Sequence, residues 1–70
     1  MTADEVRNAL TRTQLRVLKA LAAGKRQEQI ASELGINLRT VEMHVADIRS
    51  RLGAETTTEA AVVAARAGVV

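Results

Sequence analysis

The amino-acid sequence predicts an all-α domain built from four short helices. Apolar residues recur at spacings of three and four, not in the alternation that is typical of strands. The chain has no proline, and each glycine stands where such a pattern stops, at Gly24, Gly35, Gly53 and Gly68. Glycine is favoured just after a helix, because it adopts the left-handed backbone conformation at little cost.

The first two predicted helices cover residues 12–23 and 27–34. Thr11 and Gln14 have the spacing of a capping box at the start of the first helix. The apolar stripe of this helix comprises Leu15, Leu18, Leu21 and Ala22. The second helix is predicted to begin without a capping side chain, because Arg26 stands where Ser or Thr would be expected.

The third and fourth predicted helices cover residues 38–52 and 57–67. Asn37 is a good cap for the third helix, and Thr56 and Glu59 match a capping box before the fourth. The buried face of the third helix is predicted to comprise Val41, Val45, Ile48 and Leu52.

The composition of the 70 residues restricts the class of function. Cysteine is absent and the single histidine, His44, has no partner at a useful spacing, so no catalytic or metal site is expected. No aromatic residue is present to stack on single-stranded bases. Neither a signal peptide nor an apolar run of the ~20 residues that a membrane helix needs is present. We expect a soluble, cytoplasmic, non-enzymatic domain over residues 10–70, without cofactor or small-molecule ligand, after a linker or loose turn over residues 1–9.

Positive charge is concentrated in the middle of the chain. Eight basic and four acidic residues lie between Arg12 and Arg51, an excess of four, whereas the whole chain carries +2. A basic centre favours a polyanionic partner, although an ordinary solvated surface would have the same composition.

Residues 27–52 have the spacing of a DNA-reading helix-turn-helix. Ala31 is small where the two helices would approach closely, Gly35 stands where the turn needs a left-handed backbone, and Ile36 would fill the corner. On the exposed side of the second of these helices, the candidate base contacts are Arg39, Glu42, Met43 and Ala46. The candidate phosphate contacts are Lys25, Arg26, Gln27, Thr40, Arg49, Ser50 and Arg51. An ion pair with Glu55 is an equal alternative for Arg51.

From Leu10 to about Val69 the sequence resembles the LuxR/GerE-type helix-turn-helix family, the DNA-binding domain of many bacterial regulators. The resemblance is strongest at Thr40-Val41, His44-Val45, Ile48 and Leu52-Gly53. It implies that the third helix enters the major groove, that the fourth forms a homodimer, and that the protein controls transcription at the nucleoid, with RNA polymerase as a further partner. The candidate dimer residues are Val62, Val63, Ala67 and Val70, some of which could instead close the core.

Two positions on the predicted reading helix depart from the family pattern. Glu42 stands where the family usually has Lys, and Ala46 where some members have another. Gln14 replaces an acidic residue of the first helix. Glu42 and Ala46 leave open a protein-interaction module that kept the fold but lost DNA binding. A second alternative is a promoter-reading domain of sigma factors, whose helix-turn-helix resembles residues 27–52. The chain would be either a stand-alone regulator or the output domain of a larger one, such as a response regulator.

Overall fold

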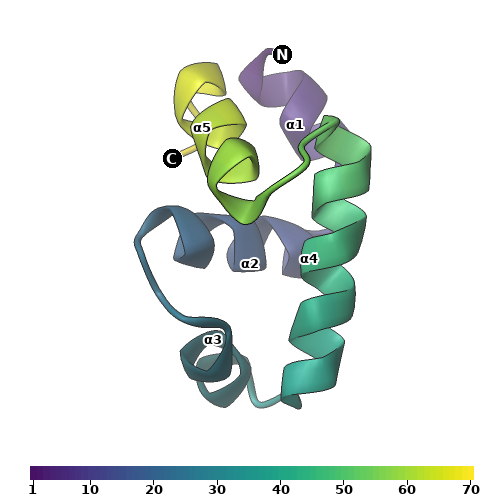
Figure 1. The fold of residues 1–70 in the computed structure, drawn as a ribbon. Coiled ribbons are helices and arrows are strands. Elements are labelled where there is room, and N and C mark those ends of the chain that lie inside the picture. Colours follow the sequence, from purple (N-terminus) through teal and green to yellow (C-terminus); the bar gives the residue numbers. More distant parts are fainter.

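The computed structural model describes residues 1–70 as five α-helices without a strand (Figure 1). In chain order they are α1 (Ala3–Ala9), α2 (Arg12–Ala22), α3 (Gln27–Leu34), α4 (Leu38–Leu52) and α5 (Thr57–Ala67). The all-α prediction is confirmed, and the four predicted helices agree with α2 to α5 to within one residue, at the end of α2.

The N-terminal segment differs from the linker or loose turn that was expected. It forms α1, where the side chain of Thr2 accepts a hydrogen bond from the backbone N–H of Glu5, and Glu5 accepts one from that of Thr2. Val6 is fully buried in the core. The helix lies beside the end of α4 and beside α5 at one end of the molecule (Figure 1).

The predicted caps of α2 and α4 are confirmed. Gln14 and Thr11 form both hydrogen bonds of a capping box, and the Asn37 side chain accepts from the backbone N–H of Thr40. At α5 only half of the predicted box forms. Thr56 accepts from the N–H of Glu59, but the Glu59 carboxylate accepts from the N–H of Glu55.

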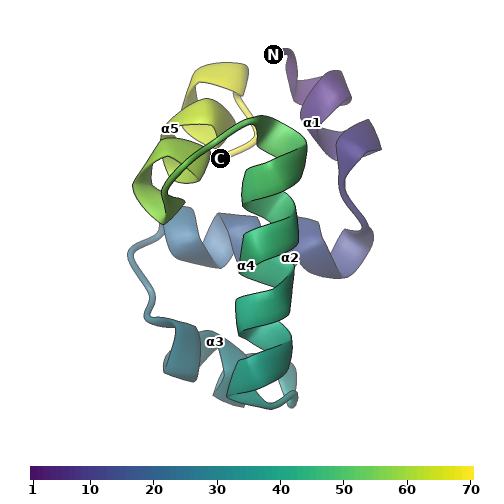
Figure 2. The same cartoon turned by 45° about the vertical axis from the view of Figure 1, so that its right-hand side comes forward.

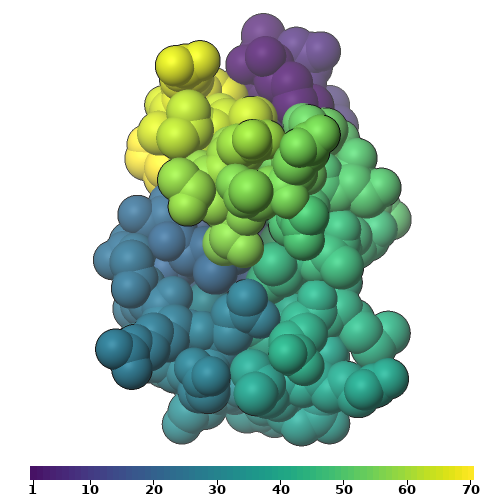
Figure 3. Space-filling view, in the orientation of Figure 1, coloured from purple at the N-terminus to yellow at the C-terminus, as the bar shows by residue number.

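The core lies where α2, α4 and α5 meet. The predicted buried face of α4 is confirmed, because Val41, Val45, Ile48 and Leu52 are all buried. Small residues on α5, Ala60 and Ala64, allow that helix to pack closely on α2. Figure 2 shows α4 crossing in front of α2, with its outer side uncovered by any other helix. On the face seen in Figure 3, α3 and α4 form the lower part of the surface and α5 and α1 the upper part.

Candidate nucleic-acid interface

A sharp turn joins α3 to α4. α3 ends at Gly35, whose φ of 67° lies in the left-handed region, and the N–H of Gly35 donates to the carbonyl groups of Ala31 and Ser32. Ile36 packs against the core beside buried Ala31. The three sequence features that predicted the turn therefore have the positions expected for them.

The four candidate base contacts lie on the uncovered part of α4. Arg39, Glu42, Met43 and Ala46 are all exposed, and Met43 is 66% exposed. Arg39, Met43, Ala46 and Ser50 follow one another at spacings of four and three, so they form one line along the helix. This line is opposite the buried face of α4, and Arg39 is its one charged residue.

The candidate phosphate contacts at the start of α3 surround a hollow of about 410 Å³. Lys25, Arg26 and Gln27 line it together with Glu42 and Thr57. Arg26 is exposed and makes no ion pair. In contrast, the Nζ of Lys25 lies 2.6 Å from the Glu33 carboxylate. Arg26 is therefore the freest cation at this helix start.

The two arginines near the end of α4 have partners inside the protein. The guanidinium of Arg49 donates to the backbone carbonyl of Glu55. Arg51 donates to the carbonyl of Ala9 over 2.8 Å, and its Nε lies 3.1 Å from the carboxylate of Asp47. The expected alternative, an ion pair of Arg51 with Glu55, is not what forms.

The two remaining phosphate candidates on α4 are Thr40 and Ser50, and only Thr40 has a hydrogen-bond partner inside the protein. The hydroxyl of Thr40 donates to the side-chain oxygen of Asn37, as part of the cap of the helix. Ser50 is exposed on the line of Met43. Of the two, Ser50 is the exposed residue, and its side chain makes no hydrogen bond within the chain.

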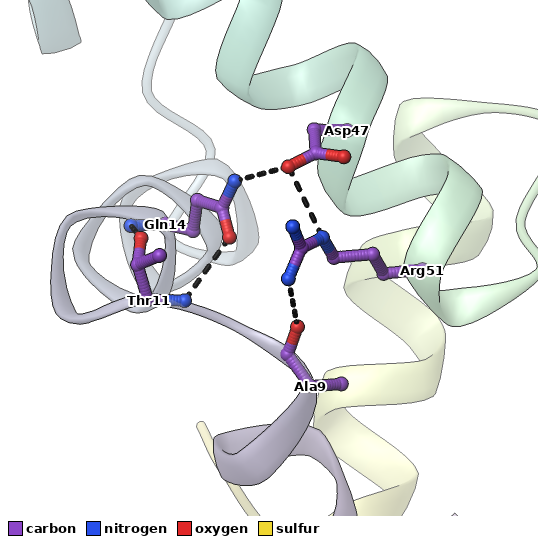
Figure 4. Close-up of polar contacts among 5 residues, drawn as sticks. All are labelled: Ala9, Thr11, Gln14, Asp47 and Arg51. Carbon is purple, nitrogen blue, oxygen red and sulfur yellow. Dashed lines mark hydrogen bonds and ion pairs between the residues drawn. The ribbon is translucent and has the colours of Figure 1, made fainter.

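A polar network joins α2 to α4, and the sequence reasoning missed it (Figure 4). The carboxamide of buried Gln14 donates to the Asp47 carboxylate over 2.6 Å. This hydrogen bond, and then the one from Arg51, hold the pKa of Asp47 below its ordinary value. The signals in the sequence were a polar residue next to an apolar stripe and the i,i+4 spacing of Asp47 and Arg51.

His44 is half-buried. It lines a hollow of about 380 Å³ with Gln14, Thr40, Met43 and Asp47. No group of three or more His, Cys, Asp or Glu side chains converges anywhere in the structure. None of the five helices combines the length and the apolar character needed to cross a bilayer.

The candidate dimer residues divide into two pairs. Val62 is 41% exposed and Val70 is 50% exposed, whereas Val63 and Ala67 are partly buried against the core. The first pair therefore offers the larger exposed area to a second chain.

Comparison with known proteins places this chain in a family. Residues 8–64 match the family described as "Bacterial regulatory proteins, luxR family". The chain is 40% identical over 60 residues to the transcriptional regulatory protein YdfI, and 40% identical over 58 residues to the transcriptional regulatory protein LiaR, both of Bacillus subtilis (strain 168). These alignments cover 86% and 83% of this chain but 28% of each relative, so the chain spans less than a third of their length. An alignment with the uncharacterized transcriptional regulatory protein YxjL of the same organism covers 97% of this chain, at 38% identity. The family match extends over most of the helical domain, and this chain therefore belongs to the luxR family of bacterial regulatory proteins.

Proposed function

We propose that this domain binds double-stranded DNA sequence-specifically and serves a bacterial transcription regulator in the cytoplasm, with α4 lying in the major groove. The observation that carries the proposal is the bare line of Arg39, Met43 and Ala46 on a helix whose opposite face is fully packed. A helix held rigidly on one side and uncovered on the other has the form needed to enter a major groove. Membership in the luxR family supports the same function.

Each exposed side chain on α4 suits a different base edge. Arg39 can donate two hydrogen bonds to guanine, and the Met43 side chain can contact a thymine methyl group. Glu42 can accept from the amino group of cytosine, which would make an acidic residue an element of specificity. Ala46 is small, so it would let the helix lie deep in the groove.

The backbone contacts that we propose are fewer than the sequence suggested. Arg26 and Gln27 stand at the N-terminus of α3, where free N–H groups and positive charge favour a phosphate. Ser50 can reach a second phosphate from the end of the line on α4. Lys25 would have to exchange Glu33 for DNA, and we propose that Arg49 and Arg51 keep their internal partners.

We further propose that two copies bind together through α5, with Val62 and Val70 in the contact. A two-fold dimer would place two copies of α4 about one helical turn of DNA apart, about 34 Å, on a roughly palindromic site. Burial of these two exposed valines would also add apolar contact area, which a domain of this size lacks.

The experiment that tests the proposal is selection of bound duplexes from a random pool, followed by fluorescence anisotropy titrations of the best sequence. We expect enrichment of two related half-sites, and a logarithm of affinity that falls linearly with the logarithm of salt concentration. Arg39→Ala should weaken binding and relax one base position, whereas Arg7→Ala on α1 is the control that should change neither.

Each alternative predicts a different result in this experiment. Equal affinity for single strands, or affinity that is independent of salt, would contradict the proposal. If the selection were repeated with RNA polymerase present, a single half-site bound by a monomer in complex with the polymerase would favour the sigma-like alternative. A stable oligomer with no duplex affinity at low salt would favour an interaction module.

A further inference from the structure

Three cations form a row along the exposed side of α2. Arg12, Arg16 and Lys19 are spaced by four and three residues, and all three are exposed. None of them takes part in an ion pair or a side-chain hydrogen bond within the chain. We call these three residues the α2 row.

The α2 row faces away from the proposed DNA surface. The buried residues of α2, Gln14, Val17 and Leu18, are on the opposite side of the helix, and that side packs against α4. In Figure 2, α2 lies behind α4 when the uncovered side of α4 is in front. A duplex held by α4 would therefore leave the α2 row free.

A groove of about 390 Å³ lies beside the row, between α2 and α3. Its apolar lining comprises Ala20, Ala23, Ile30 and Leu34, and Arg16 and Lys19 stand on its α2 side. The one carboxylate in the groove, that of Glu33, is paired with Lys25 and so repels an incoming anion little. The groove thus combines an apolar lining with two unpaired positive charges.

We propose that this surface docks an acidic, amphipathic segment of a partner protein, which inserts an apolar side chain between α2 and α3 and places carboxylates on Arg16 and Lys19. Charge complementarity selects an acidic occupant, and the apolar lining selects a polypeptide over a second DNA backbone. Arg16 and Lys19 are three residues apart, about 4.5 Å along the helix axis, a spacing close to the about 5.4 Å between carboxylates on two successive turns of a partner helix. This inference goes beyond the proposed function, because the domain could hold DNA and the partner at the same time.

The test uses the 70-residue chain and a fluorescein-labelled 14-residue peptide of Glu and Leu, with its Leu residues at helical spacing. Anisotropy would measure affinity, and amide chemical-shift mapping by NMR would locate the peptide. We expect saturable binding, with the largest shifts at Ala20, Ala23 and Leu34. A peptide with Gln in place of every Glu, and one with Ser in place of every Leu, should each bind at least about tenfold more weakly.

Variants of the row separate this site from the DNA surface. Arg16→Glu with Lys19→Glu should weaken peptide binding by about tenfold or more, and the milder Arg16→Gln with Lys19→Gln should weaken it by less. Arg7→Glu on α1 is the control that should leave affinity unchanged. Circular dichroism would check that each variant is folded. The slope of the logarithm of duplex affinity against the logarithm of salt concentration, which counts phosphate contacts, should be the same in the row variants as in the parent chain.

Three results would overturn the inference. The first is that the peptide shows no saturable binding. The second is that its chemical-shift changes are confined to α4 and the start of α3. The third is that the row variants bind duplex DNA more weakly and with a smaller dependence of affinity on salt. The last would make the row part of the DNA surface. Failure of duplex binding with retained peptide binding would instead refute the proposed function and leave this inference standing.

Discussion

The carboxamide of Gln14 on α2 donates a hydrogen bond to the carboxylate of Asp47 on α4, 33 positions further along the chain. The same carboxamide accepts the backbone N–H of Thr11, so one buried side chain both caps α2 and attaches it to α4. Asp47 in turn pairs with Arg51, which donates to the carbonyl of Ala9 (Figure 4). The network therefore fixes the orientation of α4 relative to the junction between α1 and α2.

Gln14→Glu should destabilise the domain, because a second carboxylate would then face Asp47 in place of a donor. We expect the free energy of unfolding at pH 7 to fall by about 1–3 kcal/mol, the usual effect of an unsatisfied buried polar group. Urea denaturation followed by circular dichroism measures this change. Thr13→Glu, at the exposed neighbouring position, is the control and should change stability by less than about 0.5 kcal/mol.

A second substitution tests whether the contact is the cause. Asp47→Asn in the Gln14→Glu background provides an amide donor on the other side and should recover most of the lost stability. If the double variant were as unstable as the sum of the two single variants, the two side chains would not be coupled, and the assigned contact would be incorrect.

The stability of the domain should fall in acid partly through Asp47. The hydrogen bond from Gln14, and then that from Arg51, lower the pKa of Asp47 in the folded state. A carboxyl with a lowered folded pKa contributes stability above its unfolded pKa and loses it as the pH falls through the folded value. We therefore expect the free energy of unfolding to decrease below about pH 4, where an unfolded aspartate titrates.

The contribution of Asp47 can be separated from that of other carboxyl groups. The pKa of Glu5 is also lowered, chiefly by the backbone hydrogen bond from Thr2, so some dependence on acid would remain in any Asp47 variant. In urea titrations between pH 3 and pH 6, Asp47→Asn should show a flatter decrease than the parent chain. Identical pH profiles would show that Asp47 does not contribute.

Local sequence signals were sufficient to predict four of the five helices. Caps such as Asn37 and turns such as that at Gly35 depend on residues within a few positions, and the buried face of α4 repeats at helical spacing. α1 was not predicted, because Val6 is its only large buried residue and the apolar residues spaced around it, Ala3 and Ala9, are small. The capping-box spacing of Thr2 and Glu5 was the local signal that could have found it.

The partners of the arginines could not be predicted from local signals. Arg51 contacts the carbonyl of Ala9, 42 positions away, and Gln14 reaches Asp47 across a similar separation. An arginine at the end of a reading helix has the same sequence signature whether it faces a phosphate or the protein itself. The sequence therefore predicted more phosphate contacts than there are candidate side chains without a partner inside the protein.

Val6→Ala should show that α1 is an integral part of the domain. Val6 is fully buried, so its truncation removes apolar contacts and leaves a cavity, at an expected cost of about 2 kcal/mol in the free energy of unfolding. Asn8→Ala, an exposed position on the same helix, is the control and should change stability by less than about 0.5 kcal/mol. Equal stability of both variants in thermal denaturation would mean that α1 does not pack on the domain in solution.

Glu42→Lys should tighten binding to random duplex DNA. Glu42 is exposed beside Arg26 and Gln27, so it would place a negative charge near the proposed phosphate contacts. The substitution removes that repulsion and adds a cation. Anisotropy titrations at low salt should show affinity about tenfold higher, with a salt dependence steeper by about one phosphate contact.

The control for Glu42→Lys must carry the same change in net charge at a distant position. Asp4→Lys on α1 meets this condition, because α1 lies at the opposite end of the molecule from the start of α4 (Figure 1). If Asp4→Lys tightened binding equally, net charge alone would explain the effect, and Glu42 would not lie at the groove. If only Glu42→Lys tightened binding and also relaxed a preference for cytosine in the selected sites, the carboxylate would act in the parent chain as a reader that exchanges affinity for specificity.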